Sequence, residues 1–151
     1  MNNAVSLNVE SVLVDYLTPL LGFAASVTGA SARLHEDENS LGPLGAFIDV
    51  PAVIVEVGEM PTVLETNPVY QGEVTVTVRH STERSTVRSH NTDSNLVADA
   101  LWDEADIYAA VSENQYLTLS GINHVSTSFL REGRKLETKI VFNIQISSKE
   151  I

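Results

Sequence analysis

The clearest pattern in the sequence is an alternation of apolar and polar positions near its C-terminal end. The even positions of this stretch are Leu136, Thr138, Ile140, Phe142, Ile144 and Ile146. The odd positions between them are mostly polar: Glu137, Lys139, Asn143 and Gln145. Because successive side chains of a strand point to opposite faces, this period predicts a half-buried strand. We therefore expect one face of the strand to pack on a core and the other to meet polar surroundings.

A second strand should precede this one, from Ile122 to Leu130, with a weaker alternation in which Val125 and Phe129 face inward. The segment Arg131-Glu132-Gly133-Arg134 separates the two strands, and a glycine can adopt positive φ at little cost. Together these features predict a long C-terminal β-hairpin. A hairpin of this length in a small acidic chain needs neighbours to cover it, which favours assembly over chemistry.

The first half of the chain predicts a helix, a long loop and two strands. Helical spacing of apolar residues predicts a helix over residues 8–17, which should end before Pro19 because the residue preceding a proline avoids helical geometry. Residues 22–50, rich in Gly, Ser and acidic side chains, should form a long loop. Two β-branched runs, Ala52–Val57 and Val69–Arg79, predict strands. In the second strand the expected inward residues are Val74, Val76 and Val78, and the expected outward residues are Glu73, Thr75, Thr77 and Arg79.

A polar segment and a second helix should follow. Residues 80–93 are polar except for Val87 and predict an irregular connection. Asp93 or Ser94 should cap the helix, because a short polar side chain accepts the free N–H groups of a first turn. The apolar stripe of the helix comprises Leu96, Val97, Ala100, Leu101 and Ala105, and Ile107, Tyr108 and Val111 indicate one further turn. Tyr116–Leu119 predicts a short strand leading into the hairpin.

The predicted order is helix, strand, strand, helix, strand, strand. This order is typical of an α+β fold with an antiparallel or mixed sheet, two helices packed on one face and a long C-terminal β-hairpin. The sequence contains no internal repeat or linker, so we expect a single domain over residues 1–151.

Charge and composition narrow the class of function. Twenty acidic residues against nine Lys and Arg give a formal net charge of −11. Such a surface does not bind nucleic acid through its bulk, because affinity for phosphates needs clustered cations; solubility alone is an equally good reason for the acidity. The absence of Cys excludes disulfides and Cys-ligated zinc. The start lacks a signal-peptide pattern and no apolar run could span a bilayer, so we expect a protein that is made in the cytoplasm and does not enter a membrane.

The sequence gives only a weak indication of a catalytic or metal-binding site. His80-Ser81-Thr82-Glu83 with His90-Asn91-Thr92-Asp93 offers two imidazoles and two carboxylates, which suit a divalent ion. On a polar connection without a rigid scaffold, however, a solvated loop is the favoured interpretation. Asp103, Glu104 and Asp106 could form an acid–base pair, but the sequence indicates no cleft around them. We predict no catalytic residue, no metal site and no cofactor.

The cations are more informative because they are segregated. Seven of the nine lie in two groups: Arg79, Arg84 and Arg88, and then Arg131, Arg134, Lys135 and Lys139. Two interpretations remain open for them: patches that meet an acidic subunit or phosphate, and local balancing of Glu83, Glu132 and Glu137. Trp102, at the margin of an apolar stripe, is either a core residue, which we favour, or an interface anchor. His124 should point to the solvent face of its strand.

The order of these elements resembles the tail-terminator (tail-completion) proteins of long-tailed bacteriophages. The resemblance rests on the amphipathic first helix, the proline-led strand Pro51–Val57, the strand Gly72–Val78, the helix segment Leu96–Leu101 and the C-terminal hairpin. It covers almost the whole chain and is a pattern of elements rather than an invariant motif.

This resemblance implies a non-enzymatic virion protein, made in the host cytoplasm, whose copies form a hexameric ring. Such a ring caps the tail tube, stops its polymerisation and joins the tail to the head or neck, with tail-tube and neck proteins as partners. DNA would pass through the lumen without specific binding. Two alternatives remain: a tail-tube or head-completion subunit of the same virion, and a small metal-binding or hydrolytic domain that uses residues 80–93.

Overall fold

The computed structural model describes residues 2–20, 26–32, 52–64, 68–82, 85–133 and 135–148. Three α-helices lie in these ranges: α1 (Asn2–Leu17), α3 (Val87–Trp102) and α4 (Glu104–Ser112). The strands are β1 (Ser26–Gly29), β2 (Ala52–Val57), β3 (Thr62–Leu64), β4 (Val69–Ser81), β5 (Leu117–Glu132) and β6 (Lys135–Ser148). Short 3-10 turns occupy Thr18–Leu20 and Ala30–Ala32.

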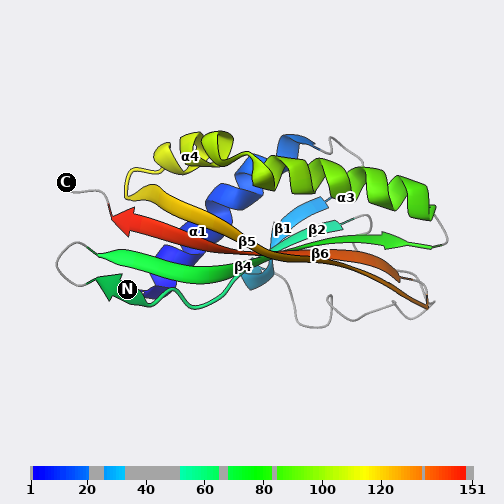
Figure 1. Ribbon diagram of the computed structural model, residues 1–151, viewed down its shortest axis with the longest axis horizontal. Coiled ribbons are helices and arrows are strands. Elements are labelled where there is room, and N and C mark those ends of the chain that lie inside the picture. Colours follow the sequence, from blue (N-terminus) through cyan, green and yellow to red (C-terminus); the bar gives the residue numbers. More distant parts are fainter. Residues whose placement is uncertain are drawn as a thin grey trace.

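The strands form one mixed sheet with the order β1-β2-β4-β6-β5, and β3 pairs with β4 beside this path. The pairing of β1 with β2 is parallel, and the remaining pairs are antiparallel. Figure 1 shows β4, β5 and β6 running along the length of the molecule, with α3 and α4 on one side of them. The predicted α+β class with a mixed sheet and a long C-terminal hairpin is confirmed.

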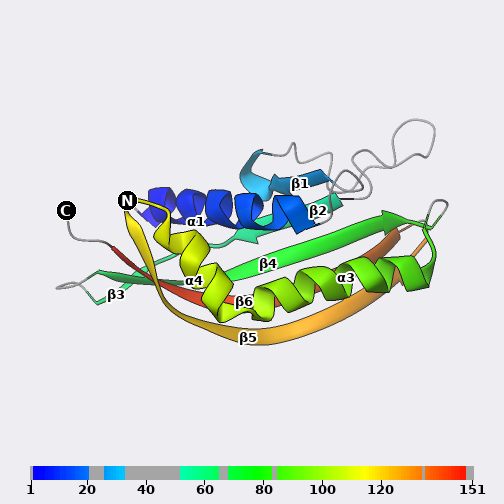
Figure 2. The same cartoon turned by 90° about the horizontal axis from the view of Figure 1, so that it is seen from above.

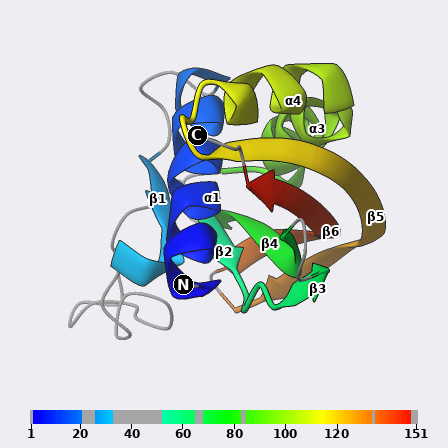
Figure 3. The same cartoon turned by 90° about the vertical axis from the view of Figure 1, so that its left-hand side faces the viewer.

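All three helices pack on the same face of the sheet. Cross-strand partners share a face, and the register places Val53 opposite Val78 and Val78 opposite Thr138 on the core side. The buried helical residues of the core cluster are Val5, Val9, Leu13, Leu17, Val97, Leu101, Ile107 and Val111. Figures 2 and 3 show the arrangement from above and from one end, with α1 beside β1 and β2 and with α3 and α4 adjoining each other.

The alternation predicted for β6 is confirmed along its length. Its six even positions from Leu136 to Ile146 are all buried, and Ile140, Phe142, Ile144 and Ile146 are fully enclosed. Gly133, between β5 and β6, has φ of 56°, a left-handed conformation that costs glycine little. The strand β4 likewise buries Val74, Val76 and Val78, as predicted. Its outward residues Thr77 and Arg79 lie on the expected face but are also buried.

The polar segment 80–93 is the largest correction. His80 and Ser81 belong to β4, and α3 begins at Val87, so most of this segment is regular structure rather than an irregular connection. Thr86, not Asp93 or Ser94, caps the helix, and its side-chain oxygen accepts a hydrogen bond from the Ser89 N–H. The helix then breaks at Asp103, which caps α4 by accepting from the Asp106 N–H.

Two other predictions need correction. Residues 26–29, within the stretch expected to be a loop, form β1; residues 33–50 of that stretch lie outside the described residues. In β5 the register skips Ser120 and Val125, so the strand carries two irregularities. As a result Val125, which we expected to be buried, is 54% exposed. Phe129 shares the helix-side face with Thr138 but is 48% exposed.

Candidate functional site

Three of the predicted metal candidates, His80, His90 and Asp93, belong to a hydrogen-bonded cluster between β4, α3 and β6, and Glu83 lies outside the described residues. The Nδ1 atoms of His80 and His90 lie 2.7 Å apart, and the rings meet edge to face. His80 Nε2 lies 2.9 Å from Asp93 Oδ2, and His90 Nε2 lies 2.8 Å from Thr138 Oγ1. Because α3 starts at Val87, its first turns carry these side chains onto the strands. The sequence pattern missed the cluster because it is polar and was read as a solvated loop.

The polar side-chain atoms of this cluster are hydrogen-bonded to one another. Both histidines are buried, and burial lowers the pKa of His90 to about 4, with the nearby His80 contributing in the same direction. Each ring nitrogen named above has a protein partner, which leaves no nitrogen lone pair directed at an open site. Among the residues that the structure describes, no group of three or more His, Cys, Asp or Glu could hold a metal ion. The cluster therefore joins α3 to the sheet.

Arg79 and Glu137 form a buried ion pair on the sheet face opposite the helices. Arg79 Nε lies 2.7 Å from Glu137 Oε2, and the two side chains are 7% and 5% exposed. They sit directly opposite each other on β4 and β6. This pair agrees with the local-balancing interpretation for Arg79, because a buried guanidinium needs a partner.

The other predicted interface residues have different environments. Arg88 on α3, Arg131 on β5 and Lys139 on β6 are exposed, and Lys135 at the start of β6 is half-buried. Arg84 and Arg134 lie outside the described residues. The start of α3, which carries Arg88, lies toward the same end of the molecule as the joined ends of β5 and β6 (Figures 1 and 2), because His80 contacts His90 of α3 and is also the cross-strand partner of Leu136 near the hairpin turn.

Trp102, which we favoured as a core residue, is 62% exposed at the end of α3. Its ring stacks on His124 of β5, with centroids 3.6 Å apart and an interplanar angle of 4°. The prediction that His124 faces solvent is wrong, because it also lies 5.7 Å from Phe142, centroid to centroid, on the core side. Burial lowers the pKa of His124, and its Nε2 is buried with no hydrogen-bond partner. A Trp held flat by a neighbouring ring yet open to solvent suits a protein interface.

The hairpin presents an open sheet edge. β5 ends the strand order, so its outer side carries backbone groups unpaired with any described strand. Three apolar side chains of this strand are exposed: Val125 and Phe129, described above, and Leu130, which is 46% exposed. A long edge with exposed apolar side chains is a surface that a neighbouring subunit can cover.

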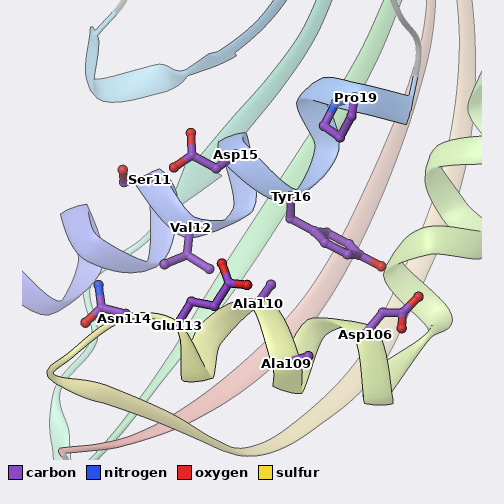
Figure 4. Close-up of a pocket in the computed structure, with 10 residues that line it drawn as sticks. All are labelled: Ser11, Val12, Asp15, Tyr16, Pro19, Asp106, Ala109, Ala110, Glu113 and Asn114. Carbon is purple, nitrogen blue, oxygen red and sulfur yellow. The ribbon is translucent and has the colours of Figure 1, made fainter.

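A groove of about 580 Å³ runs between α1 and α4 (Figure 4). Tyr16 of α1 fixes one end of it, since its hydroxyl donates a 2.8 Å hydrogen bond to the Ala100 carbonyl. In Figure 4 the Glu113 carboxylate points from α4 toward α1, and Asp15 and Asp106 also line the groove. The sequence suggested Asp106 as a candidate but indicated no cleft around it. The groove is formed with α1, which lies far from Asp106 in the chain.

The fold is shared with a solved virion component. No protein-family model matches the chain, and no curated protein matches its sequence. A chain described as "Virion of native gene transfer agent (GTA) particle" superposes with a TM-score of 0.51 at 14% identity. The match covers 95% of this chain and 96% of the other. None of the described helices is both long and apolar enough to span a bilayer. At this identity the similarity establishes a common fold.

Proposed function

We propose that this protein is a non-enzymatic structural subunit of a phage-like virion that assembles into a ring. The observation that carries the proposal is the shared fold with a chain of a gene transfer agent virion, which extends over nearly the full length of both chains. A match that covers 95% of this chain is not confined to a common core motif.

The open edge of the sheet supports self-assembly. β5 exposes both backbone groups and apolar side chains, a combination that promotes uncontrolled pairing unless neighbours cover it. In a closed ring every copy covers the same surface of the next copy, so no edge remains open. Six copies, as in the tail terminators that the sequence resembles, form such a ring.

Within the virion, we assign the ring to the end of the tail tube, where it stops polymerisation and joins the tail to the head or neck. Its partners are then the tail-tube protein and a neck protein. DNA crosses the lumen without specific binding, which suits a chain with a net charge of −11. A tail-tube or head-completion subunit of the same virion is the second candidate, because the same fold and edge serve those positions.

A metal-binding or hydrolytic function for residues 80–93 has less support. His80 and His90 bond to each other and to Asp93 and Thr138, rather than converging on an open position. Metal analysis of the purified protein, beside a His80→Ala/His90→Ala variant, tests this alternative. Stoichiometric metal that the variant lacks would favour it.

Native mass spectrometry and electron microscopy of the purified protein test the main proposal. Closed rings with a fixed number of copies support a terminator, whereas filaments of indefinite length favour a tube subunit. A strict monomer at high concentration, even with tail-tube protein added, contradicts the ring.

A further inference from the structure

The groove between α1 and α4 carries negative charge without a matching cation. Asp15, Asp106 and Glu113 line it, and none of its lining residues is Lys or Arg. Between these acids the surface is apolar or small, with Val12, Ala109 and Ala110 leaving space between the helices. A groove of this kind suits a narrow, positively charged protein segment.

The titration behaviour of the lining residues indicates the same field. The pKa of Asp106 is raised, mainly by the negative charge of Asp103 and by a hydrogen bond with its side chain. The pKa of Tyr16 is raised by burial, and the charges of Asp106 and Asp103 add to the effect. The negative charges of Asp103 and Asp106 thus contribute to both shifts, as the main cause for Asp106 and as a smaller cause for Tyr16.

The hairpin turn of the same chain has the complementary properties. β5 and β6 bring Arg131 and Lys135 to its end, and Arg134 lies between them in the sequence. Glu132 is the cross-strand partner of Lys135, so the turn sequence carries three cations and one acid. Arg131 and Gly133 are exposed, so the turn is accessible.

The turn and the groove cannot meet within one molecule. In Figures 1 and 2 the turn between β5 and β6 lies at one end of the long axis, whereas α1 and α4 lie toward the other end. We infer that the basic hairpin turn of one copy docks in the α1–α4 groove of the next copy. Such a contact joins two different surfaces, so it repeats from copy to copy and produces a closed ring when the rotation closes.

This inference rests on the proposed ring, and its test separates the two. One variant reverses the turn (Arg131→Glu/Lys135→Glu) and another reverses the groove (Asp15→Lys/Glu113→Lys). Each should raise the concentration needed for assembly at least tenfold, while circular dichroism and thermal melting stay close to the wild type. Arg88→Glu/Lys139→Glu changes net charge as the turn variant does, at exposed sites on the first turn of α3 and further along β6, and should assemble like the wild type.

Mixing the two reversed variants is the decisive step. Each reversed turn then meets a reversed groove of opposite charge, so native mass spectrometry should find assemblies with the two variants in a 1:1 ratio. For the wild type, assembly should weaken as salt rises, because exposed charge pairs are screened within about 8–10 Å at 0.1–0.15 M.

Several outcomes would overturn the contact. Wild-type rings with both variants assembling normally would refute the docking and leave the ring intact, as would equal losses in the turn variant and its matched control. Loss in the groove variant alone would mean that the groove receives another segment of the next copy rather than its hairpin turn. A monomeric wild type would refute both the ring and the contact.

Discussion

The Nδ1 atoms of His80 and His90, 2.7 Å apart, can form a hydrogen bond only if one carries a proton and the other does not. Asp93 accepts from His80 Nε2, so with a neutral His80 ring its Nδ1 is the acceptor and His90 Nδ1 is the donor. His90 Nε2 then accepts from the Thr138 hydroxyl, with the Ser94 hydroxyl 3.3 Å away. With both rings neutral, this chain of bonds joins β4, α3 and β6.

Acid should therefore destabilise the protein. The pKa of His90 is about 4 in the folded state against 6.5 for an ordinary histidine, so the unfolded chain binds the extra proton first. The contribution of neutral His90 to the free energy of unfolding is complete above pH 6.5 and is lost as the pH falls toward 4. The loss amounts to roughly 3 kcal/mol at most. Urea unfolding between pH 4 and 7 measures this slope.

A His90→Gln variant provides the control for that slope. It should be less stable than the wild type at pH 7 but should depend less on pH. The lowered pKa of His124 adds a smaller slope of the same sign, which the variant retains. A wild-type stability that does not change between pH 4 and 6.5 would contradict the assigned network.

Phe142→Ala should cost about 3–5 kcal/mol of unfolding free energy, because truncating a buried aromatic loses transfer energy and leaves a cavity. Phe142 is fully buried at the centre of β6, whereas Phe129 on β5 is 48% exposed. Phe129→Ala is thus the matched control and should cost clearly less. Denaturant unfolding of both variants compares them, and similar losses would contradict the difference in burial between the two side chains.

Gly72→Ala should destabilise β4 although the change adds one methyl group. A Cβ at this position would lie 2.7 Å from Met60 Cγ and 2.8 Å from the Glu59 carbonyl oxygen, so backbone must move. Overpacking of this kind costs about 1–3 kcal/mol. At Gly121 the nearest atom, Gln145 Oε1, would be 3.6 Å away, so Gly121→Ala should be close to neutral. Thermal melting of the two variants tests the difference.

Removing one partner of the buried pair Arg79–Glu137 should lower the free energy of unfolding more than removing both partners. Glu137→Leu leaves a guanidinium 7% exposed beside an apolar side chain and should cost about 3–5 kcal/mol. The double variant Arg79→Leu/Glu137→Leu should recover part of that loss. A double-mutant cycle in urea measures the coupling, with Glu73→Leu at an exposed position of the same strand face as a control. Additive losses would mean that the pair makes no specific contribution.

The strand β6 could be predicted residue by residue because its alternation is uninterrupted and nearly every inward position is apolar. The strand β5 could not, because its register skips Ser120 and Val125 and each skip reverses the face of the residues that follow. Val125 was therefore assigned to the wrong environment.

The candidate sites depend on contacts that the sequence pattern does not contain. The buried residues in the first turns of α3 are His90 and Ser94, so a search for apolar spacing placed the helix start too late. The α1–α4 groove joins residues almost one hundred positions apart, such as Tyr16 and Glu113, and no local pattern reveals it. The stacking of the exposed Trp102 on His124 is likewise a contact between two separate elements, α3 and β5, that no local pattern contains.

The position of β6 in the sheet has a consequence for the order of events during synthesis. β6 lies between β4 and β5 in space but follows every other described strand in the sequence. Until residues 135–148 leave the ribosome, β4 and β5 each lack a neighbour, and their unpaired edges can bind other nascent chains. The two-residue connection lets β6 pair with β5 within microseconds, on the order of 1–10 μs for a hairpin, so β4 joins last.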